Sequence, residues 1–478
     1  MADIEKQDST DLKADIAAVQ VPNATAALNA DFQLSDPLKR RLKQRHIAGT
    51  IGTGLFLGSG EALRVAGPLG ALIAYMLVGT VAYSSLCSVG EMTTFAPISG
   101  TFPHFAARWV DPAFGFAVGW NYFYGQAISV PVEVAAAVIL LGFWDDNASH
   151  AAIYTAVICV LMCAINIFGV RHTAEFFFAL IKLSTIIGLL LAGLVIDLGG
   201  GPNHDRIGFR ASAPPNEYRI RFLAIMSVII QAAFSFTGME LVAIAASETE
   251  SPRRNIGKAV NRVVYRIVVF YILGILMIGM LVSYNDDALL NTSGNAAQSP
   301  FVIAFNRAGV KVLPHIINAA VFTSAFSAGN SYLFCGSRIL YCVSSGAGTS
   351  FLVRVWLQNL TATGGFIGWF CINLTYRTCI TTLGNLILAW WGIFWTVFFT
   401  LVNGYAVFFS FDISDFLVAY INLPIFASLY VGYKFIMRTR IWKPEDMDLV
   451  TGIPSIEETE KSEIPPRTLL ERIAALLF

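Results

Sequence analysis

Charged residues are scarce in this sequence: Asp, Glu, Lys and Arg together make up 13% of its 478 residues. Soluble domains carry roughly 25%. Hydrophobic residues make up 55% of the chain, and the mean hydropathy is +0.62. This composition predicts a membrane protein that crosses the lipid bilayer many times. The formal net charge is zero, which argues against nucleic acid as a partner.

Cysteine and histidine are also rare, with seven and six residues. The cysteines form no C-x-x-C pair and have no histidine at metal-ligand spacing, so they are interpreted as small buried hydrophobic residues. Neither a metal site nor a cofactor is predicted. No cleavable signal peptide is recognised, and the polar residues 1–45 predict a largely disordered tail.

Long hydrophobic runs dominate the rest of the chain. About eleven of them are long enough to cross ~30 Å of hydrocarbon. A basic run, Lys39 to Arg45, precedes the first and places the N-terminus in the cytoplasm. The transmembrane domain is expected at 46–437 and a cytoplasmic C-terminal tail at 438–478. The expected spans are 46–64, 69–88, 113–142, 151–169, 174–197, 222–246, 263–284, 313–341, 349–374, 383–410 and 413–436.

Three connections have a composition that indicates their place. Residues 90–105 predict a short amphipathic or re-entrant piece on the cytoplasmic side, organised by Glu91. Residues 199–218 are rich in Gly, Pro and Asn and are expected outside the cell. The charged stretch 248–258 is expected to be a solvated cytoplasmic hinge.

The first span is interrupted by Ile51-Gly52-Thr53-Gly54. Glycines weaken a membrane helix and leave amides and carbonyls unbonded, which is tolerated only where the backbone is buried or lines a cavity. Amides at the start of a half-helix attract an anion such as a carboxylate. The alternative is that Gly54 and Gly58 only let two helices pack closely.

A second break, Thr237-Gly238, interrupts the sixth span. Two breaks five spans apart indicate an inverted repeat, and paired breaks of this kind point to a transporter binding site at the bilayer midplane.

Several strings resemble fungal amino-acid permeases of the amino acid–polyamine–organocation superfamily: TIGTGLFLGSG (50–60), GEMTTFAPISGTF (90–102), GWNYFYG (119–125), ALIKLSTIIG (179–188), AAFSFTGMELVAIAASETESPRRNIGKAV (232–260) and NSYLFCGSRILY (330–341). The resemblance extends from Leu38 to Arg440. It implies an all-helical, LeuT-like fold of five-plus-five inverted repeats. It also implies amino-acid transport driven by protons, at the plasma membrane or at a vacuolar or other internal membrane, and no enzyme activity.

Carried onto this chain, the resemblance places the substrate carboxylate at the amides of Gly52, Thr53 and Gly54. It places the amino group at carbonyls near Ile51 and at Phe234, Ser235 and Thr237, beside the Gly238 break. Two half-helices with opposite directions supply these positive and negative poles together. Phe236 is either a lid over the substrate or an ordinary packing residue.

Three ionisable residues lie inside apolar runs, where each is costly and so suggests a function. The resemblance puts Lys182 where sodium binds in other relatives, facing Ser327 and Ser331, and makes it a candidate proton carrier; the alternative is a fixed ion pair. Glu240 either couples protons or accepts bonds from amides freed by the break. Glu133 either joins the coupling or ties down backbone loosened by Pro131.

The sequence departs from the resemblance after Tyr341, where a loop and a ninth span are missing. The stretches between His46 and Thr50 and between Arg377 and Ala389 also look short. Eleven crossings would leave the C-terminus outside, whereas its basic residues favour the cytoplasm. Three explanations are open: one run does not cross the bilayer, the last three spans insert in the inverted orientation, or the sequence omits a segment that the real transcript encodes. We favour the omitted segment. The alternatives to a working permease are a non-transporting amino-acid sensor and an inactive truncated permease.

Overall fold

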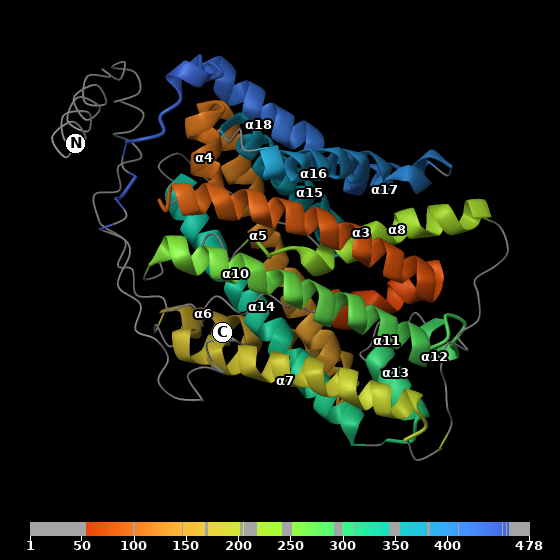
Figure 1. The fold of residues 1–478 in the computed structure, drawn as a ribbon. Helices are drawn as coiled ribbons and strands as arrows, with labels where there is room; N and C mark the ends of the chain where they lie inside the picture. Colours follow the sequence, from red (N-terminus) through yellow and green to blue (C-terminus); the bar gives the residue numbers. More distant parts are fainter. Residues whose placement is uncertain are drawn as a thin grey trace, which may run out of the picture.

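A computed structural model describes residues 54–98, 101–145, 147–167, 171–200, 204, 218–240, 251–290, 299–310, 312–343, 354–379, 383–409, 411–451, 453–455 and 457. The regular elements in these ranges are all helices, which confirms the expected all-helical class (Figure 1). The predictions for Ile51, Gly52 and Thr53, and for the tail 1–45, lie outside the described residues.

The described chain starts with a π-helix, Gly54–Gly58, and continues through helices of very different length. In chain order the α-helices are α3 (Ser59–Phe95), α4 (Thr101–Trp109), α5 (Pro112–Leu141), α6 (Ala151–Ile167), α7 (Arg171–Asp197), α8 (Tyr218–Phe236), α10 (Pro252–Arg266), α11 (Leu273–Leu281), α12 (Asp287–Leu290), α13 (Pro300–Arg307), α14 (Leu313–Val343), α15 (Arg354–Cys379), α16 (Leu383–Val402), α17 (Ile413–Tyr420) and α18 (Asn422–Met437).

The strongest hydrophobic runs became helices almost residue for residue. The run 113–142 is α5, and the run 313–341 is α14. The expected break in the sixth span is confirmed: α8 ends at Phe236, and a turn follows in which Gly238 has φ 94°. Only glycine adopts this backbone region without strain, so the residue type fixes the place of the break.

The first two expected spans meet end to end in α3. The helix is kinked at Gly67, which has φ 71°, and Pro68 follows. Proline cannot donate the backbone bond that would continue the helix. After the kink the helix continues to Phe95. Residues 90–95 of the expected connection therefore belong to α3, and the connection consists of the part after Phe95 together with α4. Glu91 accepts a hydrogen bond from Tyr376 of α15 at 2.6 Å.

The hinge expected at 248–258 is wrong for the part that the structure describes. Helix α10 begins at Pro252 and continues through a π-helix, Ile267–Ile272, into α11. Ile256, Ala259 and Val263 are buried and repeat at the spacing of one helix face. Lys258 is exposed, whereas Arg253 and Arg254 are half-buried, so the overall charge of the stretch concealed a helix with one buried apolar face.

The last expected span, 413–436, is divided into α17 and α18 at Ile421. Pro424 explains the division, because it removes the amide that would bond the carbonyl of Tyr420.

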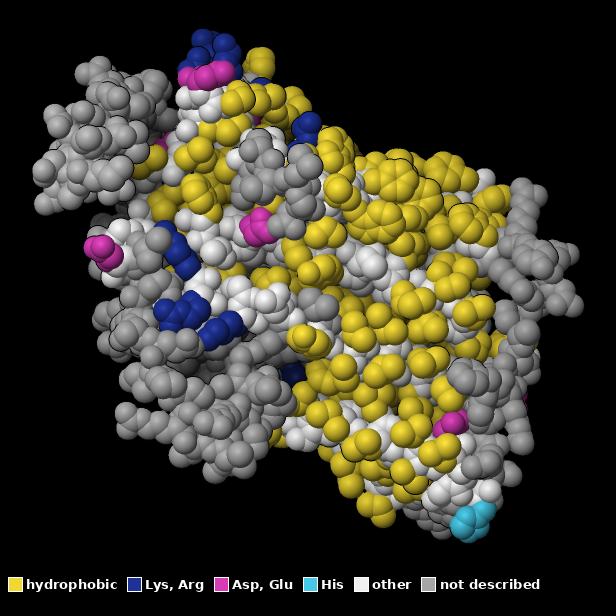
Figure 2. All heavy atoms as spheres, viewed as in Figure 1, with side chains coloured by type: hydrophobic (Ala, Val, Ile, Leu, Met, Phe, Trp, Pro, Cys, Tyr) yellow, Lys and Arg dark blue, Asp and Glu magenta, His cyan; other side chains and the backbone are white. Residues whose placement is uncertain are grey.

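Hydrophobic side chains form a broad face over the middle and right of the molecule, and Lys and Arg gather at the left (Figure 2). Among the described residues, three helical segments are long and apolar enough to cross a membrane: Ser59–Phe95, Pro112–Leu141 and Leu180–Asp197. Four more apolar segments are shorter, namely Ala151–Ile167, Phe222–Phe236, Ile267–Leu281 and Leu386–Val402. The number of crossings therefore stays a prediction.

The helix bundle has a basic end, which we define by Arg108, Arg253 and Lys434. Helix α5 starts there, because Lys434 bonds Asp111 just before its first turn. Helix α14 runs antiparallel to α5: Gly336 lies opposite Gln126, and the Trp144 indole donates to His315 at 3.1 Å at the other end. Helix α14 thus runs toward the basic end.

Helix α15 runs in the same direction as α14. Asn373 bonds Ser85 and Ser88 of α3 at 2.8 Å each, and Tyr376 bonds Glu91 further along α3. Helix α15 is therefore parallel to the second part of α3, which ends at the basic end with Phe95 packed on Trp109. Because α14 and α15 both run toward the basic end, the chain between them has to return to the opposite end of the bundle.

Candidate functional site

Gly54, the part of the first predicted break that the structure describes, lies close to the second break. Gly54, the first described residue, packs on Ser235 in the last turn of α8. A Cβ atom at Gly54 would lie 2.7 Å from the Ser235 Cα and 2.8 Å from its Oγ. No side chain fits at that distance, so glycine is required for the backbones to approach. This contact brings the end of the predicted carboxylate site to the predicted amino-group site.

Backbone oxygens in the last turn of α8 and at the break accept hydrogen bonds from protein groups. The Thr237 amide bonds the Ala233 carbonyl at 2.9 Å and closes the last turn. The Thr237 carbonyl accepts the hydroxyl of Tyr332, from α14, at 3.3 Å. A helix C-terminus carries partial negative charge. The predicted residues Phe234, Ser235 and Thr237 are all buried beside it.

Aromatic residues enclose this turn. The Phe236 ring stacks on Tyr271 with a centroid distance of 4.6 Å and meets Tyr75 at 6.0 Å. Tyr75 also lies within hydrogen-bond distance, 3.0 Å, of the Ser235 hydroxyl. Phe236 is fully buried, which fits both a closed lid and an ordinary packing residue.

Glu240 lies just past the break and is buried. Tyr122 of α5 donates its hydroxyl to Oε1 at 3.0 Å, and the Trp369 indole of α15 approaches Oε2 at 3.4 Å. The amides of Gly238 and of Glu240 itself also bond the carboxylate. The side chain therefore ties the break to two other helices, with uncharged donors around it.

Glu133 and Lys182 are also buried, at 1% and 3% exposure. The Glu133 Cβ lies against Gly329 of α14, 3.4 Å from where a Cβ on that glycine would be. Lys182 lies on α7, which packs on α14. Ser331 donates its hydroxyl to the Ser327 carbonyl at 3.0 Å. Glu133 thus lies against α14, and Tyr332 of α14 meets the break that holds Glu240.

Sequence reasoning missed Tyr75, Tyr122, Tyr332 and Trp369. Each is an aromatic residue with a polar tip inside an apolar run, and such tips find a partner when buried. That signal was present, but an aromatic residue in a hydrophobic helix is usually a packing residue, and its partner lies far away in the sequence.

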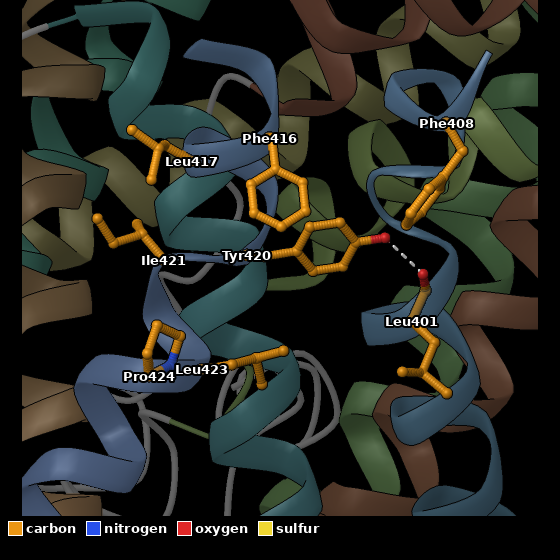
Figure 3. Close-up of a pocket in the computed structure, with 8 residues that line it drawn as sticks. All are labelled: Leu401, Phe408, Phe416, Leu417, Tyr420, Ile421, Leu423 and Pro424. Atoms are coloured by element: carbon orange, nitrogen blue, oxygen red, sulfur yellow. Dashed lines mark hydrogen bonds between the residues drawn. The ribbon is translucent and has the colours of Figure 1, made fainter. Parts of the chain in front are cut away.

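A separate cavity of about 450 Å³ lies between α16 and the α17–α18 pair (Figure 3). Its lining is apolar except for the Tyr420 hydroxyl, which donates to the Leu401 carbonyl at 2.7 Å. A zwitterion needs partners for two charges, and this lining offers none. The cavity is therefore not assigned to an amino-acid substrate.

The sequence model of the amino acid permease family matches residues 44–348. The chain is 37% identical to the proline-specific permease of Emericella nidulans, over 92% of both chains. It is 36% identical to the proline-specific permease of Saccharomyces cerevisiae, over 90% of this chain and 81% of that one. It is 34% identical to the dicarboxylic amino acid permease of the same yeast, over 89% and 82%.

These alignments are longer than the chain itself. They extend over 509, 513 and 501 positions, against 478 residues in total. The relatives therefore contain residues within the aligned range that have no counterpart here. The family match ends at residue 348, shortly after α14.

Proposed function

The chain belongs to the amino acid permease family, and from that premise we propose that it carries amino acids across a membrane by alternating access, coupled to protons. The contact of Gly54 with Ser235 is the observation that supports the substrate site most directly. In this proposal it brings together two broken helices whose poles match the two charges of an amino acid.

In this proposal the amides of Gly52, Thr53 and Gly54 bind the substrate carboxylate. Carbonyls of Ile51 and of the last turn of α8, from Phe234 to Thr237, bind the ammonium group, and Gly238 keeps that turn open. Such an arrangement needs no side-chain charge in the pocket, so it suits neutral amino acids. The proline-specific names of two relatives make proline the first substrate to test.

Proton coupling is proposed for Lys182, Glu240 and Glu133. All three are buried, and a buried ionisable group is kept in a membrane helix at a cost that a functional role explains. Glu240 has a further structural role, since its bonds to Tyr122 and Trp369 hold the break in place.

The basic end of the bundle is proposed to face the cytoplasm. Residues 1–45 and 438–478 then lie on the cytoplasmic side, and 46–437 form the transmembrane domain as a five-plus-five repeat. The plasma membrane is proposed as the location, with a vacuolar or other internal membrane as the alternative that fluorescence microscopy of a tagged protein would reveal.

Uptake of radiolabelled amino acids in a permease-deficient host tests the transport proposal. A panel of proline, aspartate and lysine covers the substrate classes in the names of the relatives. We expect saturable uptake that increases as the external pH falls. Specific binding without uptake would instead support the sensor alternative, and neither binding nor uptake would support an inactive permease.

We also propose that the sequence lacks one crossing between α14 and α15, which is the omission expected from the sequence. Both helices run toward the basic end, and only residues 344–353 connect them. Helix α15 has 26 residues, about 39 Å at 1.5 Å per residue. A stretch as short as 344–353 reaches roughly 35 Å when fully extended, and an extended backbone cannot cross hydrocarbon unpaired.

Sequencing the cDNA across the codons for Tyr341 to Ser350 decides this point. A transcript with an additional in-frame segment would support the omission and make the longer protein the active permease. A transcript identical to this sequence would contradict it, and we would then expect poor insertion and no uptake.

A further inference from the structure

The C-terminal tail is bound tightly to the basic end of the bundle. After α18, residues 442–455, of which 452 lies outside the described residues, pass α4 toward the start of α10 (Figure 1). We call this segment the tail latch. Met447 and Ile453 within it pack against the hydrophobic core.

The first attachment of the tail latch is at the end of α4. The Trp442 amide bonds the Val110 carbonyl at 2.9 Å, and the Trp442 indole donates to the Ala107 carbonyl at 3.0 Å. The tail latch thus begins with both N–H groups of Trp442 bonded to carbonyls at the end of α4.

The second attachment surrounds Asp448. Arg108 pairs with its carboxylate at 2.9 Å and also donates to its carbonyl at 2.7 Å. The Trp109 indole donates to the same carbonyl at 3.2 Å, and Arg108 donates to the Thr451 carbonyl. The side chains of Arg108 and Asp448 are only 7% and 10% exposed. A shielded, multiply bonded pair of this kind is much stronger than an ordinary surface ion pair.

The third attachment is on a different helix. Arg253, in the first turn of α10, donates to the Pro454 carbonyl at 2.8 Å and to the Thr94 carbonyl, at the end of α3, at 3.2 Å. One guanidinium thus joins the tail, α3 and α10.

We propose that the tail latch fastens α4 to the start of α10, so that the tail must detach before the start of α10 can move away from α4. The geometry supports this because the attachments lie on both helices and a single short segment spans them. Helix α10 comes after the Thr237–Glu240 break in the chain, so the latch restrains a helix on the C-terminal side of the break.

The environment of Asp448 argues against the latch being a pH switch near neutrality. Burial raises the pKa of this carboxyl, but the Thr451 amide and Arg108 outweigh it and hold the pKa below its ordinary value of 3.8. A group with a depressed pKa stabilises the folded state at higher pH and loses that effect only as the pH falls through the folded value. Asp448 therefore stays ionised at cytoplasmic pH.

Hydrogen–deuterium exchange of the purified full-length protein tests the latch by cutting one attachment and measuring the other. Arg108→Gln removes bonds between the tail latch and α4 and leaves the attachment at α10 in place. If the segment acts as one unit, exchange should rise about tenfold in residues 442–451 and also clearly in 252–258, which Arg108 does not contact. Exchange in α5 should stay unchanged, and that result would show that the variant folds.

The reciprocal variant is Arg253→Gln, which cuts the attachment at α10. We expect faster exchange of the Trp442 amide at the far end of the latch. Arg440→Gln, at an exposed arginine just before the latch, is the matched control and should change neither region. If each variant affects only the residues it contacts, the tail is merely docked on the surface and the proposal is overturned. The experiment needs no transport activity, so its failure is distinct from failure of the proposed function.

Discussion

A buried carboxylate at the centre of this protein and a largely shielded one at its basic end have very different partners. Glu240, at the centre, accepts hydrogen bonds from the uncharged groups of Tyr122 and Trp369. Asp448, at the basic end, is paired with the permanently charged Arg108. A carboxylate held by neutral donors can take up a proton without stranding a buried cation, whereas one paired with arginine cannot. The first arrangement permits proton exchange, and the second is structural.

The same contrast applies to packing. At the centre, backbone meets backbone at the contact of Gly54 with Ser235, whereas the tail latch is held by long side chains that can rearrange. We therefore expect substitutions at the centre to have larger effects than substitutions at the basic end. Four predictions, from the largest effect to the smallest, test this difference.

Gly54→Val should abolish amino-acid binding. The branched side chain would meet the Ser235 backbone at 2.7 Å and force apart the two broken helices, at a cost typical of severe overpacking, about 1–3 kcal/mol or more. Binding of radiolabelled proline to purified protein measures the effect. Gly58→Ala is the control, because a Cβ there would lie 3.8 Å from the nearest atom, in Gln231. Undiminished affinity in a folded Gly54→Val protein would rule out this site.

Lys182→Met should preserve or weaken binding but remove accumulation driven by a pH gradient. One coupled proton supports about tenfold accumulation per unit of pH difference, and we expect this to fall to simple equilibration. Uptake into vesicles with an imposed gradient gives the measurement. If concentrative uptake kept its normal pH dependence, Lys182 would be a structural residue.

Tyr122→Phe should move the pH profile of uptake toward higher pH. The change removes a donor to the ionised form of Glu240, and a hydrogen bond to a charged group contributes about 1.5–3 kcal/mol, so a shift of about one pH unit or more follows. Trp369→Phe removes the longer contact, at 3.4 Å, and should shift the profile less. Equal loss of rate at every pH in both variants would show that the donors only support the fold.

Asp448→Asn should have the smallest effect. Asparagine keeps an oxygen for the amides of Val450 and Thr451, which Asp448 bonds at 3.1 and 2.9 Å, but loses the charge that pairs with Arg108. We expect about fivefold faster exchange in the tail latch, in line with the loss of one charge-assisted bond. In the unchanged protein, exchange corrected for its intrinsic pH dependence should be the same at pH 6 and pH 8. A marked difference in exchange between the two pH values would contradict the conclusion that Asp448 is ionised at both.

Local patterns in the sequence predicted what depends on neighbouring residues. The lengths of α5 and α14 follow from continuous apolar runs, and the end of α8 follows from Gly238, whose φ of 94° suits glycine. The Gly54 contact with Ser235 followed from pairing two breaks, which is a longer-range inference but still rests on glycine positions.

What the sequence did not predict depends on pairs of distant residues. Arg253 was counted with the charges of 248–258 and Arg108 was not singled out, because nothing near them in the sequence reveals Pro454 or Asp448 as partners. The start of α10 was missed for a related reason: its charges were counted together, whereas the helical spacing of the buried residues Ile256, Ala259 and Val263 indicates the helix.

The contact between Gly54 and Ser235 also limits how this lineage can diversify. Every replacement at Gly54 adds at least a Cβ atom, and that atom would overlap backbone rather than an adjustable side chain. No sequence of tolerated single substitutions leads away from glycine at this position. In the proposed site, new substrate preferences would have to arise at side chains around the break, such as Thr237, where size and polarity can vary without separating Gly54 from Ser235.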